Sequence, residues 1–373
     1  MADSRIRHMF PGNNTGQGFF SYFAYILPQA QARRIYCLKG GPGVGKSTFL
    51  KGIGRRMAQE GFDLEYMHCA SDPDSLDGLV IPALGVALVD GTAPHVTDPV
   101  NPGAVDEIVN LGEFWDTEAL RRNRGEIVRI NAEIGRQYQR AFHYLSAAQC
   151  LMDDAAETVG PATDKAGLLL QAQRVIDGEL AQVPVSGRLG GIRRLFASAV
   201  TPAGIVRHLE SLAEGAEKIY SIKNLWGVGV HETLEKVADA AVCRGLDVEL
   251  YYCPLAPATR IEHLLIPELK LAFVSENSDF EPKGRTILDL TQYTDLKQTA
   301  PQKDALEFDS GMFHRMLDGA VGALARTKKL HDKLEGYYTP HIDFERVDQK
   351  EAEICGQILA MAGRGTTAPD HLK

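Results

Sequence analysis

The chain has 373 residues, of which 44% are hydrophobic and 24% are charged, and its formal net charge is −9. This composition is typical of a globular protein, and the length allows two domains with cores of full size. The negative charge argues against a protein that coats nucleic acid or a membrane surface, so we expect neither as a partner.

Targeting and redox signals point to the cytoplasm. The amino-terminal residues lack the apolar core of a secretory signal peptide, and the longest apolar stretch, around 79–89, is interrupted by Pro82 and Gly85. The six cysteines include no C-x-x-C pair, so they indicate neither a disulfide framework nor a metal site. We therefore expect a cytoplasmic protein with reduced thiols.

A glycine-rich loop joins the first predicted strand to the first predicted helix. Residues 35–39 have strand character, and apolar residues recur at helical spacing from about 46 to 59. A strand, this loop and a helix in that order predict a phosphate-binding loop, or P-loop. The loop consists of Gly40, Gly41, Pro42, Gly43, Val44, Gly45, Lys46, Ser47 and Thr48.

This P-loop predicts a nucleoside triphosphate as ligand, and we expect ATP with Mg²⁺. Glycines let backbone amides approach phosphates at a helix N-terminus, where the helix dipole favours negative charge. We expect Lys46 to reach the β- and γ-phosphates as a catalytic residue and the Ser47 hydroxyl to hold Mg²⁺. The other residues of the loop are expected to contact ATP.

Acidic residues follow the next two predicted strands. After the strand at about 63–68, the chain reads S-D-P-D-S-L-D-G, and Asp72 is the best candidate to orient a water, a hydroxyl or Mg²⁺. A simple turn is the alternative, since these residue types also favour turns. The strand at about 86–89 ends at Asp90, which we expect to be the Walker B acid and a Mg²⁺ ligand. His95 lies in the loop beyond it and is a candidate to sense the γ-phosphate or to help position water, with a surface histidine as the alternative.

Two helical segments complete the first half, at about 118–154 and 163–180. We expect them to cover the sheet, with a lid or a brace between domains as the alternative. The segment 182–191 is rich in Gly and Pro and predicts a linker, so the expected domains are residues 1–185 and 186–373.

The second half of the chain repeats the first. Residues 36–69 align with residues 220–253 without a gap, and matches further along the chain extend the repeat, which indicates an internal duplication. Identical pairs include Phe10/Phe196, Tyr36/Tyr220, Gly43/Gly227, Gly45/Gly229, Glu65/Glu249, Cys69/Cys253, Asp116/Asp295 and Asp164/Asp343. The predicted elements also repeat, with strands at about 218–222, 247–252 and 270–274 and helices at about 231–243, 301–337 and 344–361.

These patterns predict the α/β class, as two tandem P-loop NTPase-like domains. Each domain is expected to have three layers, α/β/α, with a mostly parallel sheet and an added pair of helices.

The second copy lacks the residues that would contact phosphate. Val230 stands at the position of Lys46, and Ser275 stands at the position of Asp90. We therefore expect a P-loop fold that binds no nucleotide. In an alternative interpretation, His231 and Glu232 form a different site at the start of the helix, although such a pair more often caps or packs.

The motifs together resemble a family of bacterial P-loop proteins that are labelled as ATP-binding proteins, ATPases or nucleotide kinases. The matching segments are L-K-G-G-P-G-V-G-K-S-T, H-C-A-S-D-P-D-S-L-D-G and V-D-G-T-A-P-H-V-T-D-P. The resemblance covers essentially the whole chain, implies ATP and Mg²⁺ at Gly40–Thr48, and supplies no established substrate. The second loop departs from the family, which more often keeps a P-loop-like sequence there.

Three functions are open from the sequence. We expect Mg²⁺-dependent ATP hydrolysis in the first domain, within an intramolecular pseudo-dimer whose second half supplies a structural or regulatory surface, or an arginine such as Arg260 or Arg285. The first alternative is a small-molecule or nucleotide kinase whose acceptor is recognised by residues 72–77. The other is a nucleotide-dependent binding module with little turnover, whose second half holds a protein partner.

Overall fold

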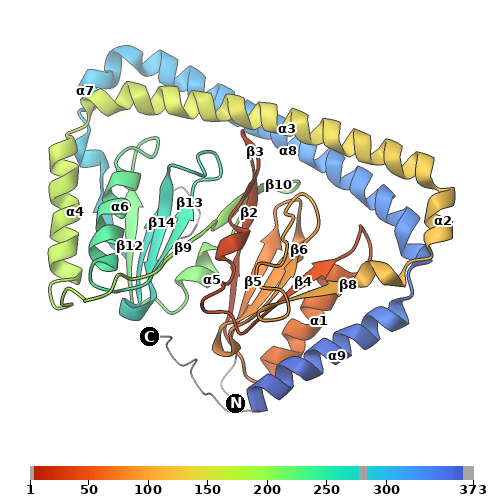
Figure 1. Cartoon of the computed structure of the whole chain (residues 1–373). Coiled ribbons are helices and arrows are strands. Elements are labelled where there is room, and N and C mark those ends of the chain that lie inside the picture. The colour runs from red at the N-terminus through yellow and green to blue at the C-terminus, as the bar shows by residue number, and fades with distance from the viewer. Residues whose placement is uncertain (1–3, 277–279, 281–283, 364–373) are drawn as a thin grey trace.

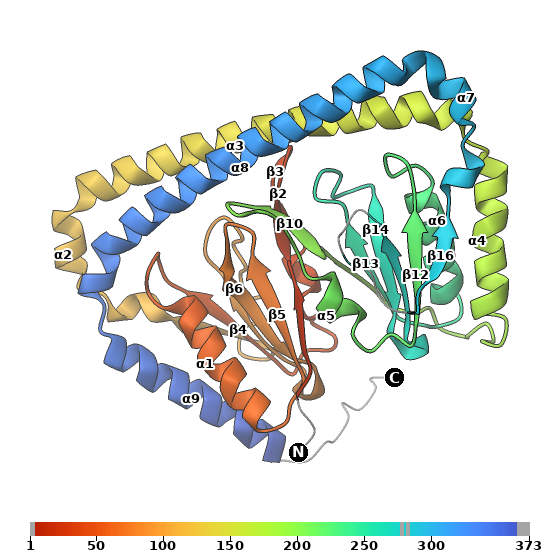
Figure 2. The same ribbon diagram turned by 180° about the vertical axis from the view of Figure 1, so that it is seen from behind.

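The computed structural model describes residues 4–276, 280 and 284–363. Two six-stranded sheets lie at the centre of the molecule, and helices flank them and run across one end of both (Figure 1 and Figure 2). No helix within the described ranges is both long enough and apolar enough to cross a membrane.

The first sheet is mixed and mostly parallel. Its strands, in spatial order, are β1 (Ile6–Met9), β5 (Leu64–Cys69), β6 (Asp72–Ile81), β7 (Val86–Asp90), β4 (Arg34–Lys39) and β8 (Asp106–Asn110). Only β6 runs antiparallel to its neighbours. β6 begins at Asp72, where the polar sequence predicts a turn or an acidic loop, so that prediction was wrong for the start of this strand.

The second sheet repeats this arrangement strand for strand. Its order is β9 (Ile192–Leu195), β13 (Val248–Tyr252), β14 (Ile261–Ile266), β15 (Leu271–Ser275), β12 (Lys218–Lys223) and β16 (Thr286–Asp289). Again only the third strand, β14, is antiparallel to its neighbours. The α/β class and the repeated halves with mostly parallel sheets are therefore confirmed.

Each P-loop position leads into a helix on the outer face of its sheet. α1 (Lys46–Gln59) starts after Gly45 at φ +89°, and α6 (Val230–Val242) starts after Gly229 at φ +81°. Positive φ is a conformation that glycine adopts without strain. The two loops thus share this glycine conformation, although Val230 stands in the second loop where Lys46 stands in the first.

Two 36-residue helices form a brace across both halves. α2 (Thr117–Arg122) leads into α3 (Arg124–Val159), and α7 (Leu296–Thr299) leads into α8 (Lys303–Tyr338). α3 and α8 run in opposite directions and lie side by side over both sheets (Figure 1 and Figure 2). Their seam is rich in small residues that allow close approach, among them Ala141, Ala148, Ala320 and Ala323.

The last helix of each half packs on the other half. α4 (Lys165–Glu179) lies against α6 of the second half, and α9 (Phe344–Gly363) lies against α1 of the first half (Figure 1). Two isolated β-bridges, Trp115–Ile342 and Thr163–Thr294, also connect the two halves, just before these helices begin. The boundary at 185/186 therefore separates two repeats along the chain, while each core includes a helix from the other repeat.

The inner faces of the two sheets share one apolar cluster, together with the short helix α5 (Leu209–Ala213). The expectation of three layers in each half was wrong, because alternate strand residues bury against the other sheet instead of a second helical layer. Across the molecule, a layer of helices is followed by the first sheet, then by the second sheet, and then by another layer of helices. The shared cluster includes Cys37, Met67 and Val89 from the first sheet and Tyr251, Ala272 and Val274 from the second.

A charged cluster joins the two halves at the edge strands β1 and β9. Arg7 and Arg193 each pair with both Glu65 and Glu249, and the four side chains are largely buried. The Arg7–Glu65 and Arg193–Glu65 distances are 2.9 and 2.6 Å. Beside this cluster, Phe10 and its repeat partner Phe196 exchange two backbone hydrogen bonds.

Candidate nucleotide site

All nine P-loop residues line one cleft of about 730 Å³ in the first half. The Lys46 ammonium lies inside the loop, donating hydrogen bonds to the carbonyls of Gly40 and Gly41 at 2.9 and 3.0 Å. It also lies 3.6 Å from the carboxylate of Asp90. Asp90 ends β7, which pairs in parallel with β4, the strand that leads into the loop. The predicted lysine and Walker B acid are therefore brought together.

Ser47 is held between the loop and β6. Its hydroxyl oxygen accepts a hydrogen bond from the backbone amide of Leu76 at 3.0 Å. This contact fixes the Ser47 side chain at the start of α1, on the same side of the sheet as Asp90.

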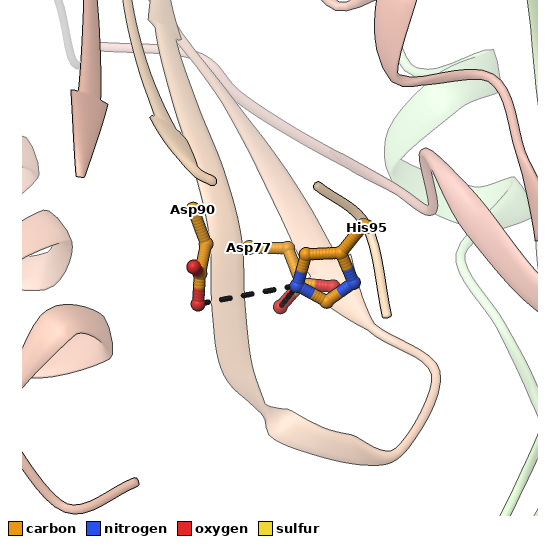
Figure 3. A group of neighbouring side chains, drawn as sticks. All are labelled: Asp77, Asp90 and His95. Atoms are coloured by element: carbon orange, nitrogen blue, oxygen red, sulfur yellow. Dashed lines mark ion pairs between the residues drawn. The ribbon is translucent and has the colours of Figure 1, made fainter. Parts of the chain in front are cut away.

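Asp77, Asp90 and His95 form a buried cluster at the base of the cleft (Figure 3). The Nε2 atom of His95 lies 3.6 Å from Asp77 and 3.9 Å from Asp90. The His95 ring stacks on Phe23, with 4.7 Å between ring centroids. His95 is thus a buried partner of two carboxylates and not a surface histidine, which favours the functional alternative over the surface one.

The cluster shifts the ionisation of each of its members. Burial raises the pKa of Asp77 to about 6. Burial alone would lower the pKa of His95, but the charges of the neighbouring Asp77 and Asp90 outweigh burial and raise the pKa of the imidazole. For Asp90, burial would raise the pKa, but the neighbouring His95 and Lys46 outweigh burial and lower it. Asp90 is therefore the firmly ionised carboxylate of the pair.

The side chains around this cluster include some, but not all, of the ligand types that Mg²⁺ prefers. Mg²⁺ prefers carboxylate, hydroxyl and water oxygens, which Asp90 and Ser47 offer within the cleft. Imidazole nitrogen suits other metals better, so His95 fits the role of a carboxylate partner better than that of a Mg²⁺ ligand. The polar ligand atoms of Asp77, Asp90 and His95 all lie within 4.8 Å of one another.

Asp72 lines the cleft but lies outside the buried cluster. Its carboxylate accepts a hydrogen bond from the Ser75 hydroxyl at 2.9 Å, lies 3.6 Å from Lys328, and is one-third exposed. Asp77, five residues further along β6, is the buried acid instead. Sequence reasoning did not single out Asp77, because only the pairing of β6 with β7 brings it beside Asp90.

The brace helices form the outer wall of the cleft. Tyr138 of α3 lines the cleft and donates a hydrogen bond to Ser71 at 2.7 Å, and Lys328, His331 and Glu335 of α8 line it as well. The end of α8 touches the loop itself, since a Cβ at Gly43 would lie only 2.7 Å from the Thr339 hydroxyl. These residues were not predicted, because they lie far from the loop along the chain.

The second half has a cleft of about 480 Å³ at the equivalent place. The repeat alignment places Val230 at Lys46, Ser275 at Asp90, Leu317 at Tyr138 and Met152 at His331, and all four replacements line this cleft. Only Glu262 retains an acid, at the position of Asp77. The second cleft is thus uncharged at these four positions, although Arg207 and Arg260 line it elsewhere.

His231 and Glu232 do not form a paired site in the second half. The Nε2 atom of His231 lies 3.8 Å from Glu235, one helical turn along α6. Among the described residues, neither belongs to a cluster with metal-ligand geometry. Arg260 lines the second cleft and pairs with Asp153 at 3.3 Å, while Arg285 precedes the edge strand β16, so neither arginine lines the first cleft.

Comparison of the chain with protein-family models, with curated proteins and with solved structures found no match.

Proposed function

We propose that the chain binds ATP with Mg²⁺ at Gly40–Thr48 and hydrolyses it, and that the second half binds no nucleotide. The observation that carries the proposal is the contact of Lys46 with the loop carbonyls and with Asp90, at the base of a cleft lined by the whole loop. A glycine loop at a helix N-terminus is built for phosphate.

Each residue of the site has a role in this proposal. Lys46 would pair with the terminal phosphates, and Ser47 and Asp90 would hold Mg²⁺, which would offset negative charge on the phosphates. Asp77 orients the attacking water and accepts its hydrogen bond, because a carboxyl with a pKa of about 6 is suited to general-base work near neutral pH. His95 contacts both Asp77 and Asp90 and so fixes the positions of the two carboxylates.

The difference between the two clefts supports hydrolysis in the first cleft alone. The second cleft replaces the loop lysine, the Walker B acid and the wall histidine by Val230, Ser275 and Met152. Arg207 and Arg260 also line the second cleft, but its glycine loop carries no lysine and the end of β15 carries no acid, so nucleotide is expected in the first cleft alone.

Phosphate release from ATP by the purified protein tests this proposal. We expect Mg²⁺-dependent release from ATP alone, which Lys46→Ala abolishes. Release only after a mixture of small metabolites is added would favour the kinase alternative, in which the polar start of β6 recognises the acceptor. Tight ATP binding without release under either condition would favour the binding-module alternative. Absence of both binding and release would contradict the proposal.

A further inference from the structure

Helix α8 of the second half carries a polar face into the cleft of the first half. Lys328, His331 and Glu335 are spaced three and four residues apart, which places them on one side of a helix, and all three line the cleft. The next turn contacts the P-loop, where Glu335 and Thr339 adjoin Gly43. The first cleft is therefore lined in part by a helix that belongs to the other repeat.

Lys328 is the cation on this face. Its ammonium lies 2.6 Å from Asp332 and 3.6 Å from Asp72. Partial burial opposes its charge, but the hydrogen bond to Asp332 and the charge of Asp72 outweigh burial and raise its pKa. The side chain is one-third exposed, and its flexible stem leaves it free to change partners within the cleft.

A short chain of contacts connects Lys328 to the P-loop. Lys328 pairs with Asp72, whose carboxylate accepts the hydrogen bond of Ser75. The next residue, Leu76, donates its amide to the hydroxyl of Ser47. The ammonium therefore faces the strand segment that positions the Mg²⁺-binding serine.

The repeat offers an internal comparison for this face. The alignment that matches Asp116 with Asp295 also matches Asp153 with Asp332 and Pro161 with Pro340. At the positions of Lys328, His331 and Glu335, α3 carries Gln149, Met152 and Ala156. The lysine is thus present on the helix that faces the intact P-loop, and absent from its repeat partner, whose Met152 lines the cleft without a P-loop lysine.

We infer that Lys328 is a catalytic residue which the second half supplies to the first, contacting the γ-phosphate of bound ATP. This inference rests on the proposed ATP hydrolysis. The water oxygen bonds to the γ-phosphorus while Asp77 accepts one of the two water protons, and the bond from that phosphorus to the β,γ-bridging oxygen breaks with its electron pair remaining on ADP. The second water proton leaves on inorganic phosphate, and Asp77 passes its proton to solvent. Lys328 exchanges no proton and supplies the positive charge that offsets the charge developing on the phosphoryl oxygens.

The test separates catalysis from binding. Phosphate release gives kcat and KM, and calorimetry with the Mg²⁺ complex of β,γ-imido-ATP gives Kd, for wild type, Lys328→Ala and Lys328→Arg. We expect Lys328→Ala to lower kcat by at least about 100-fold, the range found for removing one charge-stabilising donor, with a Kd within about tenfold of wild type. Lys328→Arg is expected to recover part of kcat. Lys329→Ala, which removes the neighbouring exposed lysine, is the matched control and should behave as wild type.

Two results would overturn the inference while leaving the proposed function in place. One is a Lys328→Ala protein that releases phosphate at the wild-type rate. The other is an equal loss of β,γ-imido-ATP binding and of phosphate release, which would mean that Lys328 only holds the cleft together. A wild-type protein that neither binds nucleotide nor releases phosphate would contradict the proposed function itself, and this inference with it.

Discussion

At the scale of single residues, the buried pair of Asp77 and Asp90 divides the work of the proposed site. Both carboxylates contact His95, yet only Asp90 also lies beside the Lys46 ammonium. His95 and Lys46 together lower the pKa of Asp90, whereas burial raises that of Asp77 to about 6. Asp90 is therefore suited to holding a cation and Asp77 to accepting a proton. The groups that surround the two aspartates thus give them different chemical roles.

Three asparagine substitutions test this division of roles. Asp90→Asn is expected to raise the Mg²⁺ concentration for half-maximal phosphate release at least tenfold, because a neutral amide binds Mg²⁺ weakly. Asp77→Asn is expected to lower kcat by about 100-fold or more with little change in the Mg²⁺ requirement. Asp72→Asn, at the partly exposed acid outside the buried cluster, should have the smallest effect on kcat. A larger loss from Asp72→Asn than from Asp77→Asn would reverse our assignment.

Part of this site could be predicted from the sequence. Lys46, Ser47 and Asp90 belong to motifs that are local, because a strand, a loop and a helix in order fix the place of each residue. Asp77 could not be singled out, since its position depends on β6 folding back between β5 and β7. Lys328 and Tyr138 reach the cleft through helix packing that leaves no local pattern in the sequence.

At the scale of elements, the exchange of α4 and α9 decides how the two halves depend on each other. α9 supplies Val347, Ile354 and Ile358 to the core that includes α1, and α4 supplies Leu168 and Val175 to the core that includes α6. The helices themselves were predicted from their periodicity. Their partners were not, because an apolar helix face fits equally well on its own sheet or on the repeat of that sheet.

Separating the two repeats tests the exchange. Residues 1–185 and 186–373, expressed alone, each lack one helix of their core and expose the apolar surface that this helix covers. We expect each fragment alone to be unfolded or aggregated and the two together to form a stable 1:1 complex, measured by circular dichroism and by mass in solution. Two fragments that fold separately with cooperative unfolding would argue against the exchanged arrangement.

At the scale of the whole molecule, the cluster of Arg7, Arg193, Glu65 and Glu249 joins the two sheets. Burial alone would raise the pKa of Glu249, but the charge and hydrogen bond of Arg7, with Arg193 beside it, lower it to about 2. A carboxylate whose pKa is lower in the folded than in the unfolded state adds stability above its unfolded pKa, near 4.5, and this stability is lost as the pH falls toward 2.

Unfolding of Glu249→Gln in urea at several pH values tests this coupling. At pH 7 the variant is expected to lose about 3 kcal/mol of unfolding free energy, because two arginines are left with one carboxylate fewer. The difference from wild type should shrink steadily as the pH falls from 5 to 2.5. Glu118→Gln, in an exposed ion pair on α2, is the control and should show no comparable change. A difference that is independent of pH would show that the lost contact is not ionic.

The central claim is that one of two duplicated clefts binds nucleotide. Calorimetric titration with the Mg²⁺ complex of β,γ-imido-ATP measures this directly, because it gives the number of sites per chain. We predict one site in the wild type and in Val230→Ala, and a loss of binding of about 3 kcal/mol or more in Lys46→Ala. Two sites per chain, or equal loss of binding in both variants, would contradict the claim.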